Sequence, residues 1–145
     1  MIIRVLDEER ANMCDNLLTK LIQDERQYDD AIDEKFVVNG YFKNVIKNSN
    51  NILLAYEEDK ILKGYIYLKE IHSGIKRGYL IDGLYVENEY RNRGIATKLI
   101  EKALTIIDDI NFIDINVMAN NIRAINLYKH FGFDEFKISL RKKKS

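Results

Sequence analysis

Residues 84–97 read Leu-Tyr-Val-Glu-Asn-Glu-Tyr-Arg-Asn-Arg-Gly-Ile-Ala-Thr: an apolar run, a polar turn and a glycine where helical spacing begins. This order predicts a strand that turns into the first residues of a helix. The first amides of a helix have no partner within it, and the helix dipole places partial positive charge there. Gly94 and Ala96 let a ligand come close to the backbone, and Arg91 and Arg93 add two cations, so the turn suits a phosphate group. A helix start with solvated arginines is the simpler alternative.

A second informative block lies between Asn121 and Phe133. Asn121 has the short acceptor side chain that caps a helix well, and it could contact a cofactor at the same time. Ala124 is a good helix former, and it is small where a helix and a cofactor would crowd. Gly132 suits the C-terminal end of the helix, with Phe133 packed beneath it. The block therefore predicts a short capped helix beside a binding site.

The two blocks together resemble the signature of the GNAT family of N-acetyltransferases. The first matches the family pattern Arg/Gln-x-x-Gly-x-Gly/Ala, and the second matches Asn-x-x-Ala-x-x-Leu-Tyr-x-x-x-Gly-Phe over residues 121–133. The resemblance implies a mixed α/β fold, in which helices flank a central, mostly antiparallel twisted sheet. It also implies that acetyl-CoA is the acyl donor, with its pyrophosphate at the turn and its pantetheine arm along the preceding strand. The implied cofactor contacts are Leu84, Tyr85, Val86, Arg91, Asn92, Arg93, Gly94, Ile95, Ala96, Thr97, Asn121, Ala124, Leu127 and Tyr128.

The resemblance also implies roles in catalysis. In many family members the tyrosine at the position of Tyr128 protonates the departing thiolate, as a phenol can do; the alternative is an aromatic ring facing the core. The N–H of Val86 is the implied donor to the oxyanion. Asp82 stands where similar aminoglycoside-modifying members carry an acidic residue, and it could hold a cationic amine or relay its proton. A solvated strand charge is an equal alternative for Asp82. His72 and His130 lack ligand spacing, so no metal site is expected.

The chain of 145 residues has the length of a single domain, expected over residues 1–145. Its hydrophobic patterns predict elements in the order β-α-α-β-β-β-α-β-α-β. The expected strands are residues 2–6, 52–56, 61–71, 78–86, 112–117 and 133–140. The expected helices are residues 8–22, 30–47, 94–108 and 121–131.

Composition argues against several classes of partner. Lys+Arg and Asp+Glu each number 23, and this balance disfavours a nucleic-acid-binding protein. No stretch approaches the roughly eighteen apolar residues of a membrane-spanning helix, so no membrane partner is expected. The single cysteine, Cys14, fits a buried apolar position, and the expected location is the cytoplasm.

Two functions are compatible with these observations. The first is an acyltransferase that passes an acetyl group from acetyl-CoA to a primary amine of a small molecule or peptide, by direct attack in a ternary complex. The second is a non-catalytic acyl-CoA-binding sensor or interaction module on the same fold. Because a pure binding module has no need of a general acid, the presence of Tyr128 favours the enzyme.

The acceptor is less well defined by the sequence. Its specificity is expected to come from residues 8–49 and from the loop at Ser73–Gly74. The acidic pairs Asp24-Glu25 and Asp29-Asp30 could attract a polycation, although solvated helix charge is the more ordinary interpretation. A homodimer is also compatible with the sequence.

Overall fold

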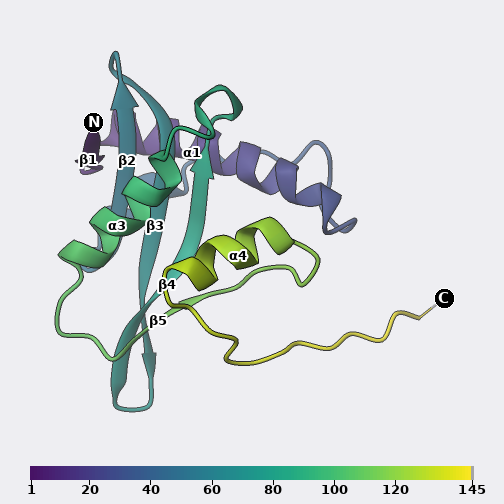
Figure 1. The fold of residues 1–145 in the computed structure, drawn as a ribbon. Helices are drawn as coiled ribbons and strands as arrows, with labels where there is room; N and C mark the ends of the chain where they lie inside the picture. The colour runs from purple at the N-terminus through teal and green to yellow at the C-terminus, as the bar shows by residue number, and fades with distance from the viewer. Residues whose placement is uncertain (145) are drawn as a thin grey trace.

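A sheet of five strands forms the centre of the protein, whose computed structural model describes residues 1–144 (Figure 1). The strands lie side by side in chain order, so β1 and β5 are the edges. Neighbouring strands are antiparallel, except that β4 and β5 are parallel, which confirms the expected mostly antiparallel sheet. The bounds are Ile2–Arg4 for β1, Ile52–Glu58 for β2, Ile61–Ser73 for β3, Lys76–Val86 for β4 and Phe112–Ile115 for β5.

Helices cover both faces of this sheet (Figure 1). α1 (Glu8–Asp24) and the short α2 (Phe42–Val45) pack on one face, while α3 (Ile95–Ile106) and α4 (Ile122–His130) pack on the other. Each face has its own apolar core, so the sheet is buried on both sides. Short 3₁₀ turns follow α1 and β4, at Glu25–Gln27 (η1) and Asn88–Tyr90 (η2). Within residues 1–144, none of the helices is long and apolar enough to cross a lipid bilayer.

The helix expected over residues 30–47 is wrong for most of its length, because only Phe42–Val45 is helical. Asp29 and Asp33 each accept a hydrogen bond from the backbone N–H two residues further on, at 3.0 and 2.9 Å. Such local bonds satisfy the backbone in a turn and so compete with a helix. Gly40, with a φ of 74°, then places the chain in the left-handed region just before α2.

Contacts with α1 fix the segment that replaces this helix. The buried carboxylate of Asp15 accepts hydrogen bonds from the N–H groups of Gly40 and Phe42, both at 2.9 Å. The hydroxyl of Thr19 accepts another from the N–H of Val38 at 2.9 Å. Residues 38–42 therefore lie along α1 as an irregular but hydrogen-bonded wall.

The strand expected over residues 133–140 is also wrong. The segment pairs with no other strand of the described chain, and it runs away from the body of the protein (Figure 1). Phe136, Ile138 and Leu140 are 85%, 77% and 90% exposed. Alternating apolar residues form a strand only when a neighbouring strand satisfies their backbone groups, and here that condition is not met. The other expected elements are confirmed to within a few residues of their bounds.

A bulge in β4 positions the rest of the site. In the register of β3 and β4, Tyr67 lies opposite Gly83, but the next pair is Leu68 opposite Ile81. Asp82 is therefore an extra residue without a partner on β3. β5 follows β4 only from Gly78 to Ile81, so the two parallel strands separate at the bulge (Figure 1). Bulges commonly redirect a side chain or end strand pairing in this way.

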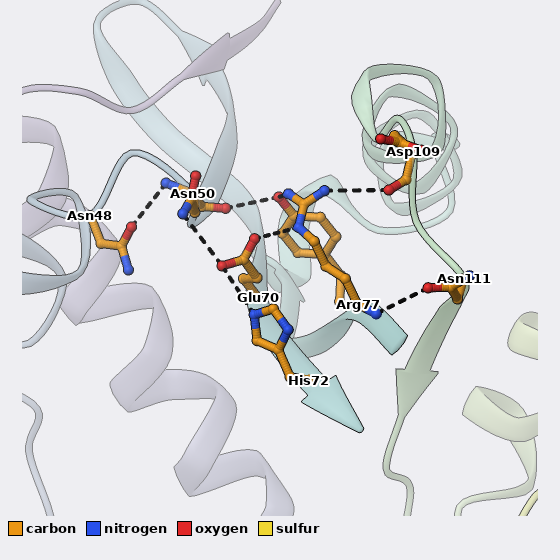
Figure 2. Close-up of polar contacts among 8 residues, drawn as sticks. Asn48, Asn50, Glu70, His72, Arg77, Asp109 and Asn111 are labelled. Carbon is orange, nitrogen blue, oxygen red and sulfur yellow. Dashed lines mark hydrogen bonds and ion pairs between the residues drawn. The ribbon is translucent and has the colours of Figure 1, made fainter. Parts of the chain in front are cut away.

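Polar side chains at the other end of β4 tie the β3–β4 hairpin to nearby loops (Figure 2). Glu70 of β3 and Arg77 of β4 form an ion pair, and the side chain of Asn50 donates to Glu70 at 3.3 Å. The N–H of Arg77 donates to the side chain of Asn111 at 3.0 Å. His72 lies 3.7 Å from Glu70, so this histidine belongs to a surface network, as the sequence indicated.

Candidate active site

The second half of β4 offers backbone groups along a free edge. The N–H of Glu87 donates to the carbonyl of Lys63 at 2.8 Å, and Val86 is opposite Gly64. Hydrogen-bonded pairs alternate along an antiparallel ladder, so the N–H and C=O groups of Leu84 and Val86 point away from β3. β5 has already separated at this level. A ligand can therefore pair with β4 as an additional strand would.

The turn after β4 ends at a helix N-terminus that is open to a ligand. Gly94 is the N-cap residue of α3, with a φ of 76° and no side-chain cap. A Cβ placed on Gly94 would meet no atom within 4 Å. The backbone is therefore accessible here, and the dipole of α3 favours an anion. This geometry fits the pyrophosphate of CoA.

The arginines of the turn have partners within the protein. Arg91 donates from Nε to the carbonyl of Val86 at 2.9 Å and from a terminal nitrogen to Asp24 at 3.0 Å. Its guanidinium also lies over the ring of Tyr85, 5.2 Å from the ring centre. Arg93 is exposed and lies over the ring of Tyr90 at 4.8 Å. Arg91 thus braces the turn against β4 and α1, and contact of either arginine with phosphate stays a prediction.

The second block forms α4 and places Tyr128 on the same face of the sheet. Asn121 caps this helix by accepting from the N–H of Ala124 at 3.2 Å. Leu127 and Tyr128 pack with Leu84 in the core that α3 and α4 cover. Burial raises the pKa of Tyr128 to about 12, and nearby Glu25 adds to the shift. The phenol therefore keeps its proton at neutral pH, as a general acid must.

A cavity of about 530 Å³ opens on the opposite face, between α1, the wall at residues 38–42, and strands β3 and β4. This size is typical of a site for a small molecule. Asp82 lines the cavity, and partial burial raises the pKa of its carboxyl group, with Lys69 acting in the opposite direction. The full lining is Leu18, Leu21, Ile22, Glu25, Phe36, Val37, Val38, Asn39, Tyr41, Phe42, Tyr65, Tyr67 and Asp82.

A family comparison agrees with this geometry. The model of the acetyltransferase (GNAT) family matches residues 15–133, which is most of the chain. The chain belongs to the GNAT family.

Several GNAT relatives carry names that specify an acceptor. An N-alpha-acetyltransferase of Sulfurisphaera tokodaii is 32% identical over 89 residues, 59% of this chain and 53% of the relative. An N-alpha-acetyltransferase of Saccharolobus solfataricus is 30% identical over 101 residues, 68% of this chain and 58% of the relative. An L-amino acid N-acetyltransferase of Escherichia coli is 30% identical over 63 residues, 41% of this chain and 39% of the relative. The chain spans less than two thirds of the length of each of these relatives.

Solved structures support the GNAT fold at lower sequence identity. A possible acetyltransferase from Clostridium difficile 630 superposes with a TM-score of 0.78 at 17% identity, covering 100% of this chain and 97% of its own. An aminoglycoside N-acetyltransferase in complex with CoA superposes with a TM-score of 0.73 at 12% identity, covering 100% of this chain and 99% of its own. At these identities the likeness concerns the fold.

The GNAT fold brings most of the predicted site residues together. The free edge of β4, the turn and the start of α3 are continuous, and Tyr128 packs against the same core as Leu84. Asp82 lies on the cavity at the bulge, just before that edge. Residues of the segment 8–49 supply most of the cavity lining, and this segment stays the predicted source of acceptor specificity. The turn at Ser73–Gly74 is absent from the lining and lies at the other end of β4.

The sequence analysis did not identify the tyrosines of the cavity. Tyr65 and Tyr67 lie on one face of β3, and Tyr41 precedes α2. A period of two in β3 places Tyr65 and Tyr67 on the same face, which is the signal that could have grouped them. The alternate residues of β3 are also apolar and buried, so the pattern does not show which face has the cavity.

Proposed function

We propose that this protein is an N-acetyltransferase that uses acetyl-CoA to acetylate a primary amine by direct attack in a ternary complex. The observation that carries the proposal is the separation of β4 and β5 at the Asp82 bulge. It leaves the backbone groups of Leu84 and the N–H of Val86 free along the edge of β4, with the cavity on one face of the sheet and Tyr128 packed against the core on the other. The GNAT family supplies the precedent for acetyl-CoA as donor.

The donor would bind along the edge of β4 and at the start of α3. The outward N–H and C=O groups of Leu84 are suited to the amide groups of the pantetheine arm, while the carbonyl of Val86 already accepts from Arg91. The accessible amides at Gly94 and the following residues are suited to the pyrophosphate. This arrangement directs the thioester toward the part of β4 that carries Asp82.

The acceptor would enter as an ammonium ion beside Asp82 and lose one proton to water. The neutral nitrogen then attacks the thioester carbonyl, and the resulting oxyanion accepts a hydrogen bond from the N–H of Val86. Collapse breaks the carbon–sulfur bond while the nitrogen releases its second proton. The departing sulfur takes a proton from Tyr128, which recovers one from solvent. The products are the acetylated amine and CoA with a free thiol.

An assay of thiol release tests this proposal. Acetyl-CoA is incubated with the protein and a panel of amines, amino acids and short peptides, and free CoA thiol is measured. Amine-dependent release with formation of the acetylated amine is the expected result. Binding of acetyl-CoA without turnover on any acceptor would instead favour a non-catalytic acyl-CoA-binding module. A cytoplasmic location and a homodimer stay predictions.

A further inference from the structure

The charges that line the cavity define the acceptor more narrowly. Asp82 and Glu25 line it, but no lysine, arginine or histidine does. The neighbouring Asp24 pairs with Arg91. In the part of the chain that the structure describes, neither Asp82 nor Glu25 forms an ion pair. The cavity therefore has two carboxylates that lack a cation.

Both residues are exposed, although neighbouring groups partly shield each carboxylate from water. Partial burial raises the pKa of Glu25, and Asp29 adds to this shift. Partial burial also raises the pKa of Asp82, although nearby Lys69 lowers it. Desolvation disfavours the charged form, and a bound cation would compensate for that cost. The electrostatics of the cavity thus favour a ligand with positive charge.

The hydroxyl of Tyr65 is an independent sign of a polar ligand. Tyr65 is 0% exposed, lines the cavity and has no hydrogen-bond partner for its hydroxyl. Buried polar groups normally have a partner, so an orphan hydroxyl needs an explanation. The oxygen would lie 2.5 Å from a Cβ at position 83, so only glycine at Gly83 lets the ring lie across β4. Gly83 follows Asp82 directly, and the ring therefore lies beside the residue proposed to hold the amine.

The rest of the lining is mostly apolar. Aliphatic side chains of α1 (Leu18, Leu21 and Ile22) contribute to it. Aromatic rings come from β3 (Tyr67), from α2 (Phe42) and from the segment before α2 (Phe36). A hydrocarbon stem can lie against such a surface with its charged ends at the two carboxylates. A free amino acid would bring a carboxylate of its own, and none of the lining residues could neutralise it.

We infer that the acceptor is a small diamine, in which an apolar stem joins two amino groups. The amine that is acetylated lies at Asp82, next to the free edge of β4, and its binding uncovers the buried phenol oxygen of Tyr65, which then accepts a hydrogen bond from it. The second ammonium group lies at Glu25. This inference rests on the proposed N-acetyltransferase function.

A matched series of acceptors tests the inference. Unbranched α,ω-diamines with three to six carbons are compared with n-alkylamines and ω-amino acids of the same lengths, and kcat/KM is measured from thiol release. The best diamine should exceed its matching alkylamine by roughly tenfold or more, the typical effect of a hydrogen bond to a charged group. The matching ω-amino acid should be the poorest of the three. Binding of 1,4-diaminobutane to the protein with CoA is measured by calorimetry in parallel.

Two variants and one matched control test where the diamine binds. Glu25→Gln should bring the kcat/KM of the best diamine down to that of its alkylamine. Glu9→Gln removes the same charge from an exposed position at the other end of α1, and it should leave the diamine preference intact. Tyr65→Phe should raise the KM of amine acceptors without changing the KM of acetyl-CoA. If Tyr65 has only a structural role, Tyr65→Phe should leave the KM of amine acceptors unchanged.

The outcomes separate this inference from the proposed function. Turnover of alkylamines, amino acids or peptides without a preference for diamines would overturn the diamine inference and leave the N-acetyltransferase function standing. Loss of the preference in Glu9→Gln as well as in Glu25→Gln would also overturn it. If acetyl-CoA binds but no amine releases thiol, and calorimetry detects no diamine, both proposals fail.

Discussion

The carboxylate of Asp15, on α1, accepts a hydrogen bond from the backbone N–H of Phe42 at 2.9 Å. Both residues are buried, with exposures of 3% and 1%. The other oxygen of Asp15 accepts from the N–H of Gly40. A single buried side chain thus holds the irregular segment whose Tyr41 and Phe42 line the cavity. Asp15 therefore couples the stability of the protein to the shape of the proposed acceptor site.

Asp15→Ala should lower the free energy of unfolding by about 1–3 kcal/mol, because it leaves a buried N–H without an acceptor. Urea denaturation measures this change. Asp33→Ala is the matched control, since Asp33 accepts a backbone hydrogen bond at 2.9 Å from an exposed position. This control should lower the free energy of unfolding by less than about 0.5 kcal/mol, because water can replace the lost acceptor. Equal effects of the two substitutions would contradict a special role for Asp15.

Gly94→Val should weaken acetyl-CoA binding by roughly tenfold or more, which corresponds to about 1.4 kcal/mol. The side chain would occupy the open space before α3, where the pyrophosphate is proposed to bind. Gly74→Val is the control, because Gly74 also has a positive φ, of 60°, and open space around it. The 11 residues of β4 separate these glycines, a distance of roughly 35 Å along an extended strand. Calorimetric titration with acetyl-CoA should distinguish the two variants. Equal affinities of Gly94→Val and Gly74→Val for acetyl-CoA would mean that the pyrophosphate does not bind at Gly94.

The acceptor KM should rise on acidification because of Asp82. Its carboxyl group has a raised pKa, and it holds a cation only when ionised, so binding is present above that pKa and lost as the pH falls through it. The loss should begin at a higher pH than for an ordinary aspartate of pKa about 3.9. Asp82→Asn should raise the KM and remove this pH dependence, while the KM of acetyl-CoA stays constant.

A substitution at Lys69 tests the same carboxylate from outside the cavity. Lys69 lowers the pKa of Asp82, so Lys69→Gln should shift the rise in acceptor KM to a higher pH. Steady-state kinetics at a series of pH values on the acid side of neutrality would detect the shift. The same pH profile in the parent protein and in Asp82→Asn would reduce Asp82 to a solvated strand charge.

The fold was predictable wherever segments that are neighbours in the sequence form backbone hydrogen bonds with one another. β2, β3 and β4 pair with their neighbours in the sequence, and their alternation gave correct strands. Local sequence patterns fail to predict the structure of a segment when residues distant in the sequence determine it. The segment before α2 is held by hydrogen bonds to the carboxylate of Asp15. The residues after Phe133 have the alternation of a strand, but within residues 1–144 no strand pairs with them.

The site was predictable to the extent that motifs encode it. Gly94 and Asn121 occupy a helix start and a helix cap, as their motifs indicated, and Tyr128 lies on a partly buried face of α4. The acceptor cavity could not be predicted in this way. It depends on the bulge at Asp82 and on the ring of Tyr65 across Gly83, which are features of packing rather than of any local pattern.

Tyr128→Phe tests the mechanism most directly. The substitution keeps the ring, which packs edge-on against Phe133 at 6.1 Å, and removes only the proton donor. General acid catalysis contributes roughly a hundredfold to ten-thousandfold, so kcat should fall within that range. Acetyl-CoA affinity and the free energy of unfolding should change little. Stopped assays of thiol release give kcat, and denaturation confirms the fold.

The pH profile and a matched variant complete this test. Because the pKa of Tyr128 is about 12, its phenol stays protonated through pH 10, and no alkaline loss of rate in that range should come from it. Tyr56→Phe removes a hydroxyl from another ring of the same core, on β2, and should keep full kcat. A decrease of only two- or threefold in Tyr128→Phe would mean that water protonates the departing thiolate. Full activity in the folded variant would exclude the acid role, and Tyr128 would then be a packing residue of α4.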